Sequence, residues 1–284
     1  MKRTGAIKGA TIHINYREFG YKAVVSLLIN ADPDETSVLI EHVEKLPDIY
    51  SVYQQGPRGN IRVIATLKNL HQLDEVKDEI KRNFQISSMK TVIWTDVREM
   101  HGNLILSDEE HETPISNTNF MDPGMRDTKC KESKIDETDL RIAEVLSQDG
   151  RAPVAEIAEE VGIPANAVKD RIAKLRQNGK LKVTIQIDPP RLGYQALAVF
   201  YTTIAPQANS ASIVDEITRI PDVISIMKTS GDYDLQIFAM IRNISKLLEI
   251  QEKIAKTRGI AKIEMEISGF FGAWPTPRQY MSTF

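Results

Sequence analysis

The sequence predicts an α+β protein in which a helix–turn–helix domain lies between two copies of a smaller α/β unit. Two observations lead to this prediction. A segment of helical periodicity lies near the middle of the chain, and one pattern of strands and helices occurs both before and after it. The chain has 284 residues, of which 42% are hydrophobic, so its length and composition suit about two domains with ordinary cores.

The repeated pattern begins with a strand region that ends in Gly-Tyr. Residues 5–21 read GAIKGATIHINYREFGY, and residues 179–194 read GKLKVTIQIDPPRLGY. Both contain a Gly, a Leu or Ile, a Lys, alternating strand residues and the final Gly-Tyr. The next segments are KAVVSLLINA and QALAVFYTTIA, whose continuous hydrophobicity is typical of a strand covered on both faces.

The remaining elements follow in the same order in both copies. SVLIEHVEKLPDIYSV and SIVDEITRIPDVISI each predict an amphipathic helix that stops before a Pro and is followed by a strand. Each copy then has a strand, an Asn at the turn (Asn69 and Asn243) and a second helix. A last strand closes each unit, near residues 90–97 and 261–268. The order β-α-β-β-α-β is that of the ferredoxin-like fold, in which two helices cover one face of a four-stranded sheet.

The helix–turn–helix prediction covers residues 135–183. Its first helix is IDETDLRIAEVL, and Gly162 separates the second helix from a third that Pro164 opens. Apolar residues at i, i+3, i+4 and i+7 indicate the second helix, namely Val154, Ile157, Ala158 and Val161. The third helix buries one apolar stripe, which consists of Val168, Ile172 and Leu175.

Charge is distributed unevenly along this domain. Residues 165–182 carry six basic residues against one acidic residue, whereas residues 136–160 carry eight acidic residues against two basic ones. The whole chain has a net charge of −3, so the positive potential is confined to the third helix and the few residues after it. A short basic helix after a Gly turn is how helix–turn–helix proteins enter the major groove of DNA. The alternative is a solvated amphipathic bundle with no DNA-binding role.

We therefore expect the third helix to bind double-stranded DNA. In its N-terminal half, Asn166 could pair with adenine and Asp170 could accept from a cytosine amine. Arg171, Lys174 and Arg176 would contact phosphates. The full set of expected DNA-binding residues is Asn166, Lys169, Asp170, Arg171, Ala173, Lys174 and Arg176.

Composition excludes several other classes of protein. The only cysteine, Cys130, rules out an internal disulfide, and it lies in a polar stretch where an incidental thiol is favoured over a redox sensor. The five histidines are scattered, and no phosphate-binding or nucleophile motif is present. No apolar run is long enough for a signal peptide or a membrane span. We expect a cytoplasmic, non-catalytic protein with no metal, no cofactor and no membrane contact.

The predicted boundaries follow from these patterns. The first ferredoxin-like domain covers residues 1–100, and a flexible linker of mixed polar composition covers residues 101–134. The helix–turn–helix domain covers residues 135–183, and the second ferredoxin-like domain covers residues 184–270. The aromatic tail, residues 271–284, is expected to pack on a sheet face or on a partner.

Six motifs occur in an order that closely resembles the leucine-responsive/asparagine regulator (Lrp/AsnC) family. They read IDETDLRIAEVL, EIAEEVGI, AVKDRIAKL, LGY, IPDV and SGDYDL. The resemblance covers residues 135–268, and the first unit extends it to residues 5–97. It implies a transcriptional regulator with a winged helix–turn–helix. It also implies that the ferredoxin-like unit, called the RAM domain, dimerises and senses an amino acid or a similar small metabolite.

The sequence departs from the family pattern in two respects. Pro153 and Pro164 occupy positions where the family usually has a Ser or Thr helix cap, and each missing cap costs about 1 kcal/mol. The first residues, MKRTGAIKG, are similar to the end of a recognition helix and its following turn, without the helix–turn–helix that would precede them. The chain is therefore interpreted as a fused double regulator with one DNA-reading head.

The resemblance places effector contacts in one loop of the second unit. The expected effector-binding residues are Thr229, Ser230, Gly231, Asp232 and Asp234, which surround Tyr233. Their amides and carboxylates could hold the two charged groups of an amino acid. The alternative is a plain β turn. In the first unit, Arg58 and Asn60 replace the two acids, so that copy is either a degenerate sensor used for pairing or a site for a different ligand.

Three functions are compatible with this architecture. The first is a DNA-binding regulator that forms at least a homodimer, so that two recognition helices meet two half-sites. The second is an enzyme similar to the siroheme decarboxylases, which resemble the same family. The third is an interaction scaffold that does not bind DNA. The two RAM-type units could pair within one chain or between chains.

Overall fold

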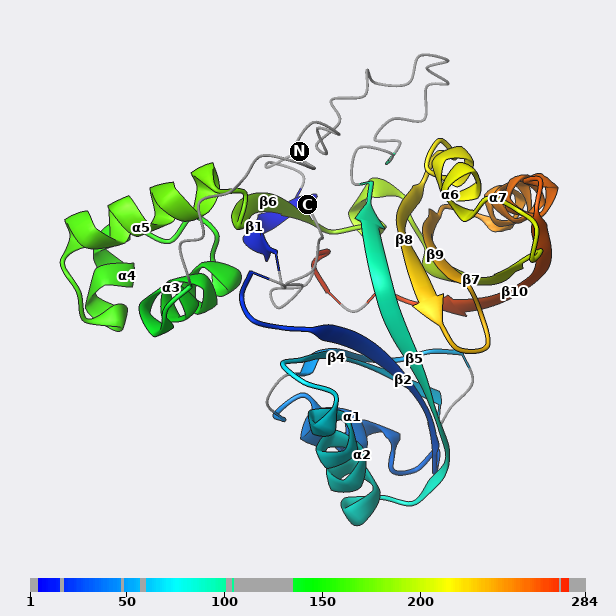
Figure 1. The fold of residues 1–284 in the computed structure, drawn as a ribbon, viewed down its shortest axis with the longest axis horizontal. Helices are drawn as coiled ribbons and strands as arrows, with labels where there is room; N and C mark the ends of the chain where they lie inside the picture. The colour runs from blue at the N-terminus through cyan, green and yellow to red at the C-terminus, as the bar shows by residue number, and fades with distance from the viewer. Residues whose placement is uncertain are drawn as a thin grey trace. The chain divides into compact units, whose positions relative to one another are not determined.

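The computed structural model describes residues 5–15, 18–46, 49–56, 60–100, 104, 135–270 and 272–275. It confirms an α+β protein with an antiparallel sheet and a helix–turn–helix domain (Figure 1). The chain divides into two compact units. The smaller unit takes Met1–Lys22, Met121–Arg191 and Gly272–Phe284, and the larger unit takes Ala23–Phe120 and Leu192–Phe271.

The smaller unit combines a helix–turn–helix domain with a two-stranded antiparallel sheet. Its elements are β1 (Ile7–Ile14), α3 (Glu137–Gln148), α4 (Val154–Val161), α5 (Ala165–Gln177) and β6 (Leu181–Ile187). The apolar faces of the three helices pack against β1 and the first residue of β6. This core contains Ile12, Ile14, Phe19, Ile142, Leu146, Ile157, Val161, Val168, Leu175 and Leu181.

The helix boundaries follow from local sequence. Asp136 and Asp139 form a reciprocal capping box at the start of α3. Gly162 ends α4 in the left-handed conformation, with φ of 78°, as the sequence predicts. Pro153 and Pro164 occupy the N-cap positions of α4 and α5, and neither provides a side-chain cap hydrogen bond. The helix caps that the sequence lacks at Pro153 and Pro164 are therefore also absent from the structure.

The position of β1 corrects the predicted boundaries of two domains. The predicted first ferredoxin-like domain covers residues 1–100, but its first 22 residues, which include β1, belong to the smaller unit, where β1 pairs with β6. The apolar faces of the three helices need a further surface to pack against. Ile12 and Ile14 of β1 provide it, which explains why β1 lies in this unit. The second boundary also moves, from 183/184 to 191/192, since all of β6 stays with β1.

The β1–β6 ladder joins equivalent residues of the internal repeat. Thr11 lies opposite Thr184, with Ala10 opposite Ile185 and Ile12 opposite Val183. When the two copies are aligned on their Gly-Tyr ends, Thr11 and Thr184 correspond to each other. The pairing is therefore symmetric about this threonine pair, as in a contact between two identical strands.

The larger unit is built on one eight-stranded antiparallel sheet with the strand order β10-β7-β9-β8-β5-β2-β4-β3. The first half contains β2 (Ala23–Ala31), α1 (Thr36–Val43), β3 (Ile49–Gln54), β4 (Asn60–Leu67), α2 (His71–Asn83) and β5 (Ile86–Glu99). The second half contains β7 (Ala196–Ile204), α6 (Ser210–Ile217), β8 (Val223–Ser230), β9 (Leu235–Ile241), α7 (Ile244–Lys256) and β10 (Ile260–Ser268).

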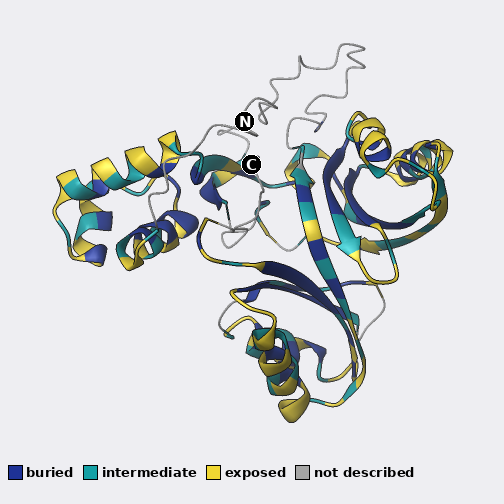
Figure 2. Cartoon of the chain, viewed as in Figure 1, coloured by how far each residue is buried: buried dark blue, intermediate teal, exposed yellow. Residues whose placement is uncertain are grey.

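Each half has its own core between its helices and one face of its strands. In the first half, α1 and α2 cover the face that carries Val25, Leu27 and Val63. In the second half, α6 and α7 cover the face that carries Phe200 and Ile237. Figure 1 shows each helix pair on its own part of the sheet, and Figure 2 shows that the strands are mostly buried while the outer helix faces are exposed.

The sheet becomes continuous where β5 pairs with β8. Within each half the strands have the same spatial order, β5-β2-β4-β3 in the first and β10-β7-β9-β8 in the second. The two halves are joined by β5, the last strand of the first half along the chain, which pairs with β8, the second strand of the second half. β5 can make this contact because it extends to Glu99, whereas the corresponding β10 ends at Ser268.

The predicted linker, residues 101–134, lies outside the described residues except for Leu104, as does Cys130. Of the aromatic tail, residues 272–275 are described. The main chain of Trp274 exchanges two hydrogen bonds with Ile187 of β6, at N–O distances of 2.8 and 2.9 Å. Gln186 also donates its amide to the carbonyl of Pro275. This part of the tail thus lies along a strand edge of the smaller unit.

The substitution Gly150→Ala tests the docking of β1 on the helices. A Cβ atom at residue 150 would lie 2.6 Å from the carbonyl oxygen of Thr11, and Gly150 donates its N–H to the carbonyl of Ala10. We expect a loss of about 1–3 kcal/mol in the free energy of unfolding, because two main-chain segments must move apart. Urea denaturation measures this loss. Gly269→Ala is the control, because nothing lies within 4 Å of its added Cβ, and an equal effect of both substitutions would contradict the close approach.

Candidate functional site

The third helix of the helix–turn–helix domain, α5, has the polar face that the sequence predicts. Val168 and Leu175 are buried in the core of the smaller unit. Six of the seven expected DNA-binding residues are exposed, namely Asn166, Lys169, Asp170, Ala173, Lys174 and Arg176. Their i, i+3, i+4 and i+7 spacing places most of them along one side of the helix. The structure thus leaves this face available to a ligand.

Arg171, the seventh expected residue, forms ion pairs within the domain. Its guanidinium lies 2.7 Å from the carboxylate of Asp136 and 2.8 Å from that of Asp139, both at the start of α3. The hydrogen bond from the N–H of Asp139 and the Arg171 guanidinium hold the pKa of the Asp136 carboxyl below its usual value. The charge of Arg171 is thus paired, and the pairing links α5 to α3. Its expected phosphate contact stays a prediction.

A second basic residue of this segment is also engaged within the unit. Lys180, which contributes to the positive charge counted in the sequence, is buried, and its ammonium lies 3.0 Å from Glu18. The basic face of α5 is consequently carried by Lys169, Lys174 and Arg176. Asp170 adds one acid to the same surface.

The expected effector loop is a hairpin between β8 and β9. The N–H of Thr229 donates to the carbonyl of Asp234 at 2.8 Å, and the Thr229 hydroxyl donates to the carbonyl of Tyr233 at 2.6 Å. Gly231 has φ of 142°, in the range that favours glycine. The turn geometry that the sequence offered as an alternative is therefore present.

The two acids of this hairpin differ in their surroundings. The carboxylate of Asp234 accepts the N–H of Ile204 at 2.7 Å and so ends β7. Asp232 is exposed and lies 3.7 Å from the ammonium of Lys90 on β5. Both carboxylates are exposed, as are Ser230 and Gly231, but Asp234 bonds to the main chain whereas Asp232 faces the ammonium of a side chain. The corresponding residue of the first half, Arg58, lies outside the described residues.

A buried guanidinium, which sequence reasoning did not single out, connects the two halves of the larger unit. Arg62 on β4 is fully buried. It donates to Gln55, to the hydroxyl of Ser26 at 2.7 Å and to the hydroxyl of Tyr201 on β7. Glu266 on β10 supplies the nearest carboxylate, 3.9 Å away. The inner faces of the two halves therefore meet around a polar cluster.

Tyr201 is the centre of this Arg62 cluster. Its hydroxyl accepts from Arg62 and from the amide of Gln55 and donates to Glu266 at 3.0 Å. Burial raises the pKa of Tyr201, although the charge of Arg62 opposes this shift. The neighbouring Tyr233 donates to Glu264, and burial followed by this bond raises its pKa to about 12. Both phenols stay protonated at neutral pH.

The position equivalent to Arg62 in the second half is Gln236. Both residues come two positions after the end of their hairpin, in IRVIATL and LQIFAMI. Gln236 is fully buried, yet neither atom of its amide has a hydrogen-bond partner among the described residues. Of the two equivalent positions, Arg62 thus has hydrogen-bond partners for its charged group, whereas the amide of Gln236 has none among the described residues.

Paired substitutions test this difference. Arg62→Met should lower the free energy of unfolding by about 3 kcal/mol or more, because Ser26, Gln55 and Tyr201 lose buried partners. Gln236→Leu should leave it within about 1 kcal/mol or raise it, because no bond is lost. Thermal and urea denaturation of both variants measure the two effects. Equal losses would show that the cluster has no special role.

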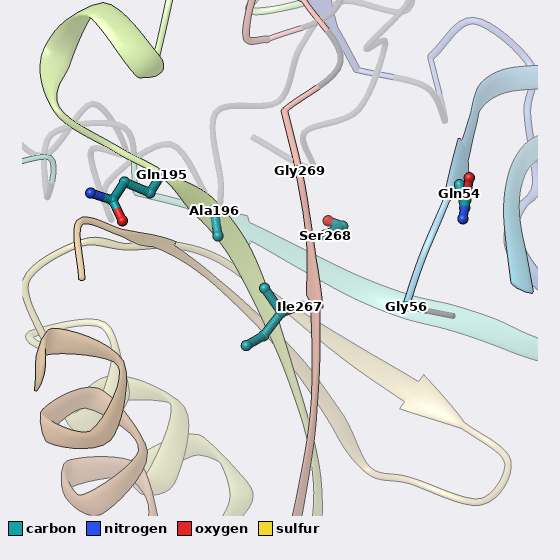
Figure 3. A pocket seen from close by; sticks show the side chains of 7 residues that line it. All are labelled: Gln54, Gly56, Gln195, Ala196, Ile267, Ser268 and Gly269. Carbon is teal, nitrogen blue, oxygen red and sulfur yellow. The ribbon is translucent and has the colours of Figure 1, made fainter. Parts of the chain in front are cut away.

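A shallow open groove lies where the free ends of the sheet come near each other, with a volume of about 450 Å³. Gln54 and Gly56 line one side, and the other side is formed by the start of β7 and by Ile267 and Ser268 at the end of β10 (Figure 3). The Ser268 hydroxyl is buried and has no hydrogen-bond partner among the described residues. The sequence gives no signal for this groove, because it depends on where β10 stops.

Two kinds of feature are absent from the described residues, a membrane-spanning helix and a group of metal-binding side chains. No helix in the described part of the chain is long and apolar enough to cross a membrane. Among the same residues, no group of three His, Cys, Asp or Glu side chains could hold a metal ion.

Comparison with known proteins matches both kinds of domain. A model of the AsnC-type helix-turn-helix domain matches residues 135–176, and a model of the Lrp/AsnC ligand binding domain matches residues 199–268. The HTH-type transcriptional regulator FL11 of Pyrococcus horikoshii is 31% identical over 127 residues, which are 44% of this chain and 83% of that protein. LysM of Saccharolobus solfataricus is 31% identical over 129 residues, or 45% and 89% of the two chains.

A solved structure resembles nearly the whole chain. The siroheme decarboxylase NirDL has a TM-score of 0.62, covering 99% of this chain and 81% of its own, at 13% sequence identity. At that identity the similarity shows a shared fold and nothing about activity. The sequence relationship is to the regulators, and the chain belongs to the Lrp/AsnC family of HTH-type transcriptional regulators.

Proposed function

We propose that this protein is a transcriptional regulator that reads duplex DNA with α5. The exposed face of this helix carries the proposal, because it presents Lys169, Lys174 and Arg176 beside Asn166 in a helix–turn–helix domain. Lysine and arginine supply phosphate contacts, and asparagine can read adenine in the major groove. Arg171 is left out of this set because it is bound to α3.

The salt dependence of DNA binding tests this role. Lys174→Ala should weaken binding to all sequences and lower the slope of log affinity against log salt by about one unit, since one phosphate contact is lost. Arg171→Ala is the informative comparison. It should reduce the stability of the helix–turn–helix but leave the slope nearly unchanged. Electrophoretic shifts at several salt concentrations measure both, and unchanged slopes for Lys169→Ala and Lys174→Ala together would exclude α5 as the reader.

The two halves of the larger unit are proposed to be two RAM-type, ferredoxin-like domains in one chain. Supporting this, they share one element order and one strand order, and the bond from the N–H of Gln55 to the carbonyl of Asn60 has its equivalent in the bond from Thr229 to Asp234. The Lrp/AsnC ligand binding model matches the second half. A fusion of this kind builds within one polypeptide a contact that otherwise requires two.

The effector is proposed to be an amino acid or a similar small metabolite bound beside Asp232. Both carboxylates are exposed, but that of Asp234 holds the main-chain N–H of Ile204, whereas that of Asp232 has the exposed ammonium of Lys90 3.7 Å away. A thermal-shift screen of the wild type against the common amino acids identifies a ligand. Asp232→Asn should then abolish the shift without changing the unliganded melting temperature, whereas Asp234→Ala should lower that temperature. A shift that survives Asp232→Asn places the effector elsewhere.

Self-association is part of the proposed function. The described part of the chain carries one helix of this kind, and specific DNA binding by this motif usually needs two half-sites about one helical turn apart. Two chains would supply a symmetric pair of readers. Light scattering should then give twice the chain mass of 32.0 kDa.

A second candidate function follows from the shared fold with siroheme decarboxylase NirDL, which extends over 99% of this chain. In that case the larger unit would turn over a siroheme-type substrate, and the basic face of α5 would have no partner. DNA-shift assays together with decarboxylation assays on siroheme separate the two candidates. Turnover of siroheme without any DNA binding would overturn the regulator proposal.

A further inference from the structure

The two ends of the eight-stranded sheet are unequal. In the described part of the chain, β3 and β10 each have one neighbouring strand, so each presents a free edge. Free edges invite pairing with another strand unless charges, prolines or bulges protect them. β10 contains Lys262, Glu264 and Glu266, whereas β3 reads IYSVYQ and contains no charged residue and no proline. A register shift interrupts β3 only near its start.

The hydrogen-bonding direction along β3 identifies the groups at this edge. The N–H of Gln55 donates to the carbonyl of Asn60, toward β4. Residues alternate in an antiparallel ladder, so Tyr53 and Ser51 also bond toward β4. The N–H and C=O groups of Val52 and Gln54 therefore point away from β4, to the free edge.

The second half shows how an edge of this kind is covered. Its hairpin has the same bond, from the N–H of Thr229 to the carbonyl of Asp234, so Ile226 and Lys228 are the counterparts of Val52 and Gln54. There the edge is not free. β5 pairs with it, with Arg98 opposite Ile226 and Asp96 opposite Lys228.

The strand that would cover β3 in the same way is too short. Ser268 is the counterpart of Trp94, because each pairs with the second residue of its neighbouring strand, Leu197 or Val24. β5 continues for five residues beyond Trp94, and it covers β8 with them. β10 ends at Ser268, and the groove beside Gln54 and Gly56 marks the place that a longer strand would fill (Figure 3).

We propose that the free edge of β3 binds β3 of a second copy of this chain, antiparallel, so that two eight-stranded sheets become one. This inference rests on the proposed self-association and names its surface. β3 of the second copy is preferred over its β10 as the partner strand for two reasons. β10 carries charged residues, and it ends at Ser268, before the positions that in β5 pair with β8. Antiparallel pairing of a strand with its own copy is two-fold symmetric, so it closes as a dimer. Val52 then faces Gln54 of the second copy, and the outward N–H and C=O groups of both residues are satisfied.

Hydrogen exchange on the full-length protein tests the pairing directly. At concentrations where light scattering shows dimers, the amides of Val52 and Gln54 should exchange at least tenfold more slowly than in the dilute, monomeric protein. The amides of Tyr53 and Ser51, which bond within the sheet, should be slow at both concentrations. This measurement needs no variant, so a failure to fold does not obscure it.

Two substitutions supply the complementary test. Gln54→Pro removes one outward N–H, and Gln54→Lys adds a charge to each copy at the shared edge. Each should raise the dimer dissociation constant at least tenfold. Gln207→Lys is the matched control, because Gln207 lies in a turn of the other half, away from the β3 edge. It should leave the dissociation constant unchanged.

The outcomes separate this inference from the function on which it rests. Dimers that persist in Gln54→Lys, with fast exchange at Val52 and Gln54 in the wild-type dimer, would overturn the β3 surface and leave self-association intact. A wild-type chain that stays monomeric at every concentration would overturn both. Slow exchange at both amides together with weakened dimers in the two variants would establish the interface.

Discussion

The larger unit depends on one contact, the antiparallel pairing of β5 with β8. This pairing joins two four-stranded sheets, each covered by helices on one face only, and it leaves their other faces to meet. Arg62 is buried between those faces. Moving a guanidinium out of water is costly unless its donors are bonded, and here Ser26, Gln55 and Tyr201 accept from it. The cluster can form only after the two halves are joined, so it specifies how they meet.

The smaller unit also depends on a contact between segments that lie far apart in the sequence, β1 and β6. A three-helix head of this size leaves apolar residues that need a further surface, and β1 supplies it from the other end of the sequence. Because β1 and β6 are equivalent segments of the repeat, their ladder is symmetric about Thr11 and Thr184. A single chain thus contains a strand contact that two separate copies of one shorter protein could make.

The sequence was sufficient for the elements whose signals are local. The apolar spacing in α4, the Gly162 break and the buried stripe of α5 all correspond to the observed helices, and the repeat placed every strand of the larger unit in order. It was insufficient for features that depend on contacts between residues far apart in the sequence. Nothing local distinguishes Arg171, bound to α3, from Lys174, which is exposed. The placement of β1 and the role of Arg62 likewise depend on residues more than a hundred positions away.

Arg62 and Gln236 can differ because the two halves of the larger unit belong to one chain. Tyr201, which bonds to Arg62, lies directly opposite Gln236 on the neighbouring strand, so both equivalent positions adjoin one buried phenol. In an assembly of two identical chains, both positions would carry the same residue. Two guanidinium groups there would repel each other in a region with little water to screen them, and two amides would leave Tyr201 without its charged partner. Within one chain, one position can carry the charge while the other remains neutral, and β5 can likewise extend where β10 stops.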